Sequence, residues 1–250
     1  MSQYLSGNYY CLTDQGKVRK TNEDYAKCAI NAYGNVLLIV ADGMGGASRG
    51  DYASSTTAKF IVDSFLSQYE EFKSVKAARK WLSDAINEVN GIVFRKSTRV
   101  TEYKGMGTTL SVCLIIKDTL ITAQIGDSRI YRLTDGELEQ ISVDQTYVNY
   151  LINTKQLSPE EAHTHPDRHK LTNALGTKET LNVDINTYEY HGERLLLCSD
   201  GLYNNVPFED LASTIKGNDS IDKKCLQLIA FGNANGGTDN MAVAIWEANN

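Results

Sequence analysis

Four aspartates stand at the ends of short apolar runs that have the composition of buried strands. Asp42 follows "VLLIVA" and Asp200 follows "LLLCS", and both are succeeded by glycine. Asp127 ends the run "TAQIG", and Asp239 comes shortly before "MAVAIW". A turn after a strand often contains Asp-Gly, which could account for any one of them. If the four strands lie side by side, however, the four carboxylates converge.

Converging carboxylates need a compensating charge. They repel one another, and burial raises the free energy of the ionised forms. No Lys or Arg stands close to Asp42, Asp200 or Asp239 in the sequence. A hard divalent cation would balance them, and oxygen ligands without nearby His or Cys favour Mg²⁺ or Mn²⁺ over Zn²⁺. Glycine after the aspartate lets the backbone approach closely, so that a carbonyl can also bind the ion.

Short aliphatic runs bounded by Gly, Asp or Asn predict the strands that carry these carboxylates. The predicted strands are 35–42, 108–116, 119–127, 129–133, 194–200 and 240–246. Apolar residues at helical spacing predict two long helices, one over about 51–68 and one from Ser74 onwards, which should both lie on a sheet. The segment 144–180 is polar and poor in strand patterns. We therefore expect a single domain over 1–250, with an inserted flap at about 144–180.

Within the flap, "SPEE" at 158–161 has the spacing of a capping box, with Ser158 as N-cap and Pro159 as first helical residue. The tract "HTHPDRH" at 163–169 has three histidines, which could suggest zinc, but a solvated helix and loop is the simpler interpretation. Other hydrolase and nucleotide-binding signatures are missing, including G-x-x-x-x-G-K-[ST], H-E-x-x-H and G-x-S-x-G.

Composition narrows the class of protein further. The chain has 250 residues, 42% of them hydrophobic, and a formal net charge of −6. This acidic balance gives no electrostatic reason to bind nucleic acid or an anionic membrane. No apolar run approaches the roughly 18 residues that span a bilayer, and no signal-peptide pattern opens the chain. The five cysteines include no C-x-x-C pair, so we expect buried, reduced thiols in a cytoplasmic protein. We also expect a monomer.

Seven segments in order resemble the metal-dependent PPM family of protein serine/threonine phosphatases, also called PP2C, in its compact bacterial form. They are "TDQGKVRKTNEDY" (13–25), "VADGMGG" (40–46), "MGTTL" (106–110), "GDSRIYRL" (126–133), "LTNALG" (171–176), "LLCSDGL" (196–202) and "GGTDNMAVAI" (236–245). The resemblance implies an α+β fold, in which a central antiparallel β-sandwich is flanked by helices on both sides. It also implies hydrolysis of phosphoserine and phosphothreonine in proteins, typically the targets of a serine/threonine kinase, by a water that bridges two metal ions.

The resemblance assigns the metal ligands residue by residue. Asp42 would bridge two Mn²⁺ or Mg²⁺ ions, and the carbonyl of Gly43 would bind one of them. Asp200 and Asp239 would hold the second ion, and Glu23 would reach a metal through water. All five positions carry the residue that the family pattern requires.

Three further residues receive roles from the resemblance. Asp127, together with Asp200, resembles a third metal site of bacterial members. Arg19 matches the arginine that binds the substrate phosphate, for which a guanidinium offers two parallel hydrogen bonds. Asp24 resembles a residue that orients the metal ligands. Without the resemblance, the polar segment around Arg19 would pass for a solvated turn.

Two departures from the family pattern leave an alternative open. Bacterial relatives commonly have histidine after "DGMGG", where this chain has Ala47, and Asp-His-Ser/Thr at the start of the flap, where it has Gln145. The first departure removes a group that could protonate the leaving oxygen. The alternative is therefore a pseudo-phosphatase, which binds phosphoproteins as a regulator without turning them over.

Overall fold

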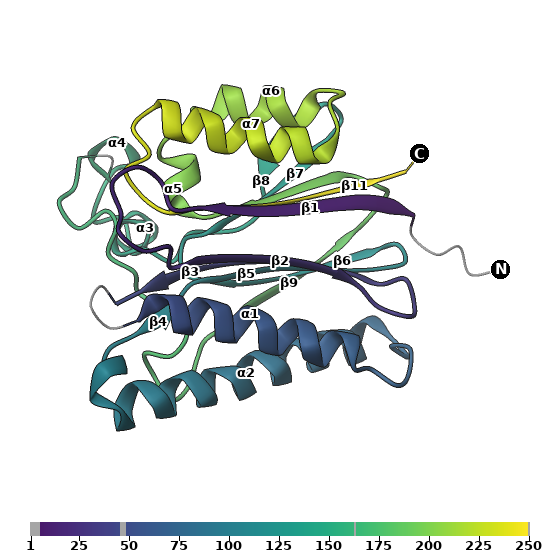
Figure 1. The fold of residues 1–250 in the computed structure, drawn as a ribbon, viewed down its shortest axis with the longest axis horizontal. Coiled ribbons are helices and arrows are strands. Elements are labelled where there is room, and N and C mark those ends of the chain that lie inside the picture. Colours follow the sequence, from purple (N-terminus) through teal and green to yellow (C-terminus); the bar gives the residue numbers. More distant parts are fainter. Residues whose placement is uncertain (1–5, 46–48, 163, 250) are drawn as a thin grey trace.

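Two antiparallel sheets packed face to face form the centre of the fold. The structure is a computed structural model that describes residues 6–45, 49–162 and 164–249. Figure 1 shows four layers, in which one pair of helices covers the upper sheet and a second pair covers the lower sheet. The predicted α+β fold, with helices on both sides of a β-sandwich, is confirmed.

The upper sheet has the strand order β1-β11-β10-β7-β8. Its strands are β1 (Gly7–Asp14), β7 (Arg129–Thr134), β8 (Glu137–Gln140), β10 (Arg194–Cys198) and β11 (Met241–Ala248). The lower sheet has the order β2-β3-β5-β6-β9, with the short β4 paired to β3. Its strands are β2 (Asp24–Ile30), β3 (Val36–Met44), β4 (Gly107–Thr108), β5 (Leu110–Ile116), β6 (Thr119–Ile125) and β9 (Asp184–Glu189).

The helices cover the outer faces of the sandwich. Below the lower sheet lie α1 (Gly50–Leu66) and α2 (Val75–Arg99), followed by the 3₁₀ helix η2 (Thr101–Tyr103). Ser74 caps α2, since its hydroxyl accepts a hydrogen bond from the N–H of Ala77 at 3.1 Å. Above the upper sheet lie α6 (Phe208–Lys216) and α7 (Ile221–Ala234), and the short α5 (Asp200–Tyr203) follows β10.

Three apolar layers hold the four structural layers together. Side chains of β3 alternate between two of them: Leu37 and Ile39 pack against the α1 and α2 layer, whereas Leu38 and Val40 pack between the sheets. Because both faces of β3 are buried, its sequence is a continuous apolar run. The third layer lies between the upper sheet and the α6 and α7 pair.

The predicted strands and the two long helices are present, with corrected ends. The run 108–116 contains two strands, β4 and β5, and the strands predicted to end at 127 and 200 end at Ile125 and Cys198. The sequence interpretation missed the four edge strands β1, β2, β8 and β9 and the helices α5, α6 and α7. All five cysteines are free thiols, as expected, although Cys11 and Cys28 are only partly buried.

Residues 144–180 contain only short helices, α3 (Tyr147–Asn153) and α4 (Pro159–Ala162), joined by loops. The predicted capping box is confirmed, because the N–H of Ser158 donates to Glu161 Oε2 at 2.9 Å and the N–H of Glu161 donates to Ser158 Oγ at 3.3 Å. In the ranges that the structure describes, no helix combines the length and the apolar character that a membrane crossing requires.

Candidate active site

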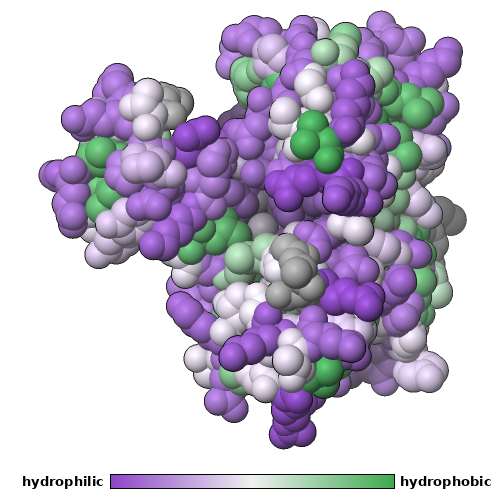
Figure 2. Space-filling model, turned by 60° about the vertical axis from the view of Figure 1, so that its left-hand side comes forward, coloured by the Kyte–Doolittle hydropathy of each residue, from purple (hydrophilic) through white to green (hydrophobic). Residues whose placement is uncertain are grey.

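A cavity of about 920 Å³ opens at the end of the sandwich where the predicted carboxylates meet. Figure 2 looks towards this end and shows a largely hydrophilic surface, from which the segment with α3 and α4 projects on the left. Seven of the eight predicted site residues line the cavity, namely Arg19, Glu23, Asp42, Gly43, Asp127, Asp200 and Asp239. The eighth, Asp24, lies behind the wall of the cavity.

Strand pairing brings these residues together from distant parts of the chain. Asp42 lies near the end of β3, and its register partner on β2 is Asp24. Asp200 begins α5 directly after β10, and Asp239 immediately precedes the start of β11. Because β10 and β11 are neighbours in the upper sheet and β2 and β3 in the lower one, the carboxylates face one another across the gap between the sheets.

Burial and mutual repulsion raise the pKa values of these carboxyl groups. The pKa of Asp42 is well above its ordinary value, first because of burial and then because of the neighbouring charges, of which Asp24 is the largest. Burial, followed by the charge of Asp239, raises the pKa of Asp200. Burial, followed by the charge of Asp200, raises the pKa of Asp127 to about 7. The cavity therefore concentrates negative charge that a cation would stabilise.

Asp24 is positioned as a support for the residues that line the cavity. The hydroxyl of Ser199 donates to Asp24 Oδ2 at 2.5 Å and accepts from the N–H of Ala242 at 2.8 Å. Burial raises the pKa of Asp24 to about 7, although the hydrogen bond from Ser199 opposes this shift. Asp24 and Asp42 are register partners on β2 and β3. Asp24 thus connects Ser199, which follows β10, with the strand pair that carries Asp42.

Two glycines allow backbone segments to meet at the cavity. A Cβ atom on Gly43 would lie 2.2 Å from the carbonyl oxygen of Gly50, and one on Gly201 would lie 1.9 Å from the carbonyl oxygen of Asn240. No side chain fits at such distances. The glycines after Asp42 and Asp200 therefore permit the backbone to approach closely, as expected. The backbone of Gly50 approaches Gly43, and the backbone of Asn240 approaches Gly201.

Several polar atoms at the cavity are bound by protein partners. Arg19 Nη2 donates to Asp239 Oδ2 at 2.7 Å, and the N–H of Gly50 donates to Glu23 Oε1 at 3.0 Å. The side chain of Asn240 accepts from the N–H of Glu23 at 2.9 Å and donates to the carbonyl of Thr21 at 2.9 Å. As the side chains stand, no three His, Cys, Asp or Glu residues in the described ranges are arranged to hold a metal ion.

Sequence reasoning missed several residues of the cavity. Arg168, His169, Lys170 and Leu171 extend into it from the flap segment, and Asn204, Asn205 and Thr238 complete its wall. The tract "HTHPDRH" could have indicated these cavity residues, because it places basic residues beside the start of the "LTNALG" motif. Ala47 and His163 lie outside the described residues.

Gln145, the second departure from the family pattern, has a structural role at the start of the segment 144–180. Its Oε1 accepts from the N–H of Gly126 at 3.0 Å and from Asn173 at 2.9 Å, and its Nε2 donates to Asp184 at 2.7 Å. It therefore ties the segment 144–180 to the loop before Asp127.

The cavity itself offers five carboxylates, a donor set that fits hard divalent cations such as Mn²⁺ and Mg²⁺.

Comparison with known proteins supports this assignment. A sequence model of the family named protein phosphatase 2C matches residues 16–225. The chain is 34% identical over 238 residues to the serine/threonine phosphatase stp of Listeria welshimeri, covering 95% of this chain and 94% of that protein. The structure of the Streptococcus agalactiae serine/threonine phosphatase superposes with a TM-score of 0.91 at 32% identity, covering 97% of this chain and 100% of the other.

A further solved structure contains metal ions. The catalytic domain of the serine/threonine phosphatase PstP, in complex with 2 manganese ions, superposes with a TM-score of 0.83 at 29% identity. The alignment covers 98% of this chain and 100% of that domain. The sequence match over most of the chain and the shared fold give the same answer: this chain belongs to the protein phosphatase 2C family.

Proposed function

We propose that this protein is a metal-dependent phosphatase that hydrolyses phosphoserine and phosphothreonine in proteins. The main support is the cavity at the end of the sandwich, where five carboxylates from five separate segments converge. Burial raises the pKa values of four of them. Membership of the protein phosphatase 2C family supports the same activity.

The carboxylates that line the cavity are the proposed ligands of two Mn²⁺ or Mg²⁺ ions. Asp42 and the carbonyl of Gly43 would hold one ion, Asp42, Asp200 and Asp239 the other, and Glu23 would bind through water. When bound, such a pair of ions would activate a bridging water as the nucleophile, and the ions would neutralise the charge of the phosphoryl oxygens. Asp127, with Asp200, is the proposed ligand of a third, weaker ion.

Two residues act without binding an ion in this proposal. Arg19 is half exposed at the mouth of the cavity, where its guanidinium can bind two oxygens of the substrate phosphate and hold them for in-line attack. Asp24 keeps Asp42 in position, because its own carboxylate is fixed by Ser199. Residues 144–180 serve as a flap on a single domain that works as a cytoplasmic monomer on the targets of a serine/threonine kinase.

Metal removal and ligand replacement test the proposed function. Treatment with EDTA should abolish hydrolysis of p-nitrophenyl phosphate, and Mn²⁺ or Mg²⁺, but not Zn²⁺, should restore it. Asp42→Ala and Asp239→Ala should each eliminate turnover, because each change removes a ligand of the proposed ions. Full activity of the protein in metal-free buffer would refute the proposal.

The pseudo-phosphatase alternative rests on Ala47, which cannot donate a proton to the leaving oxygen. An Asp239→Asn variant separates the two functions when it is compared with the wild type in saturating Mn²⁺. A phosphatase shows turnover that this variant lacks. A pseudo-phosphatase binds a phosphopeptide, measured by fluorescence anisotropy, but releases no phosphate in either form.

A further inference from the structure

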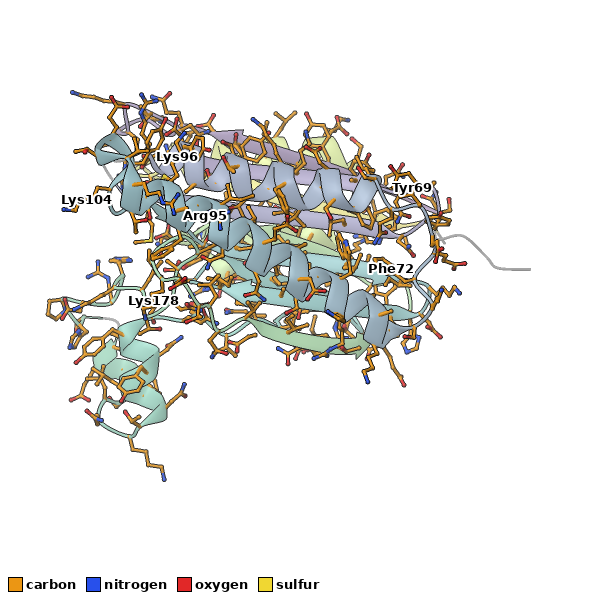
Figure 3. All side chains as sticks on the ribbon, turned by 90° about the horizontal axis from the view of Figure 1, so that it is seen from below. Tyr69, Phe72, Arg95, Lys96, Lys104 and Lys178 are labelled. Atoms are coloured by element: carbon orange, nitrogen blue, oxygen red, sulfur yellow. The ribbon has the colours of Figure 1, made fainter. Side chains whose placement is uncertain are left out.

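A positively charged surface lies at the same end of the molecule as the cavity, on the helical layer below it. The segment 95–104 contains four Lys or Arg residues and one acidic residue, although the whole chain has 25 basic and 31 acidic residues. Figure 3 shows Arg95, Lys96 and Lys104 at one end of α2, with Lys178 nearby. We call these four residues, together with Arg49, the basic surface.

A chain of contacts links the basic surface to the cavity. The residue after Arg49 donates its backbone N–H to Glu23, which lines the cavity. The guanidinium of Arg49 lies 5.9 Å from the ring centre of Tyr103. The ammonium group of Lys96 lies 4.4 Å from the ring centre of Tyr103 and 4.3 Å from the ring centre of Tyr52. The basic surface therefore begins beside the cavity and continues onto α2.

Over the part of the chain that the structure describes, the cations of this surface have no acidic partners. Elsewhere, Arg129 pairs with Asp144 and Arg194 pairs with Glu247. Within residues 6–45, 49–162 and 164–249, none of the five side chains of the basic surface forms an ion pair. Aromatic rings fix Lys96 in place, but a ring face does not neutralise the ammonium charge. The surface therefore has unbalanced positive charge available to a ligand.

Helix stabilisation explains only part of this pattern. Basic residues in the last turn of a helix interact favourably with the partial negative charge of its C-terminus, and Lys96 is in the last turn of α2. Arg49, Lys104 and Lys178 lie outside that helix, so the same effect does not account for them. Arg49 also adopts the left-handed conformation, with a φ of 71°, directly before α1.

We infer that the basic surface binds an acidic segment of the phosphoprotein substrate, on one side of the phosphorylated residue that enters the cavity. This inference rests on the proposed function and adds a substrate class to it, namely phosphorylated sites flanked by Asp and Glu. Cations at the rim of a binding site attract an oppositely charged segment and increase the rate of encounter. The effect should appear in KM, since these residues do not reach the reacting phosphate.

A double charge reversal on exposed residues tests the inference. The variant is Arg95→Glu/Lys104→Glu, and the matched control is Lys73→Glu/Lys76→Glu, which makes the same change in net charge at the opposite end of α2. The substrates are a phosphothreonine peptide flanked by Asp and Glu, the same peptide with neutral flanks, and p-nitrophenyl phosphate. All measurements use the full-length protein with Mn²⁺.

The variant should have about tenfold lower kcat/KM for the acidic peptide, through a higher KM. An exposed ion pair is worth up to about fivefold in affinity, and charge reversal replaces two attractions by repulsions. The neutral peptide and p-nitrophenyl phosphate should be hydrolysed at wild-type rates, and raised salt should reduce the effect. The control variant should behave as the wild type with all three substrates.

Three kinetic outcomes would overturn the inference. They are an unchanged KM of the variant for the acidic peptide, an equal loss in the control variant, and a parallel loss with p-nitrophenyl phosphate. Fluorescence anisotropy gives a readout that does not depend on turnover: the acidic peptide should bind the wild type more tightly than the variant. If the wild-type protein shows no turnover, the proposed function is contradicted. The difference in peptide binding between wild type and variant still decides the inference in that case.

RNA binding is the remaining outcome. If the wild type binds single-stranded RNA in preference to the acidic peptide and the variant does not, the surface binds nucleic acid and the inference is overturned.

Discussion

Replacing Asp127 by asparagine tests how strongly the crowded carboxylates destabilise the protein when no cation balances them. Asp127 is only 6% exposed, and its pKa rises from 3.8 to about 7 because of burial and then the charge of Asp200. The folded state therefore holds the proton more tightly than the unfolded state. The free energy of unfolding therefore falls as the pH rises from about 4 to 7, and this loss of stability is complete above the pKa of the folded state.

The magnitude follows from the two pKa values. A difference of about 3 units at about 1.4 kcal/mol each gives a loss of about 4 kcal/mol at pH 8. At pH 5 the folded carboxyl group is still protonated, and the loss is about 2 kcal/mol. The asparagine amide has nearly the same shape and does not ionise. Relative to the wild type, Asp127→Asn should therefore gain about 2–3 kcal/mol of unfolding free energy between pH 5 and pH 8.

Urea denaturation in EDTA at the two pH values measures this difference. In thermal denaturation the same gain corresponds to roughly 4–12 °C in Tm for a chain of this size. Asp219→Asn is the control, because Asp219 is exposed and its replacement should give the same small effect at both pH values. Adding Mn²⁺ at pH 8 should stabilise the wild type by mass action. An Asp127→Asn effect that is independent of pH, or larger at pH 5, would refute the reasoning.

Four other substitutions test the packing and chemistry around the cavity. Gly201→Ala should lower the unfolding free energy by about 3 kcal/mol in urea denaturation, since the new Cβ atom would lie 1.9 Å from the carbonyl oxygen of Asn240. Arg129→Met should lower it by about 3 kcal/mol, because the side chain of Asp144 is only 10% exposed and would lose its cation. Asp144→Leu in the same protein should recover most of that loss, and additive effects in this double-mutant cycle would contradict the coupling. Ala47→His should raise kcat/KM for a phosphopeptide more than for p-nitrophenyl phosphate, whose leaving group needs no proton; a positioned acid contributes about 10²–10⁴-fold.

The centre of the fold was predictable because its strands are buried on both faces. β3 and β5 have continuous apolar sequences, and β10 is apolar up to its end, so each appears as a strand without alternation. The edge strand β1 escaped prediction because Tyr9 and Tyr10, in the middle of it, are both substantially exposed. The helices α6 and α7 have 9 and 14 residues and are separated only by Gly217 and a few polar residues, so the sequence interpretation did not resolve them as two helices.

The contact between Arg19 and Asp239 could not have been predicted from spacing, because 220 positions separate the two residues. Only the pairing of β1 with β11 brings their loops together, and Asn240 fastens them through the carbonyl of Thr21. The contact also bears on the proposed function. Asp239 Oδ2, which accepts from Arg19 at 2.7 Å, is one of the oxygens available to a cation. In the proposed function, a divalent cation bound at that oxygen would repel the guanidinium of Arg19, whose donors would then be free for the substrate phosphate.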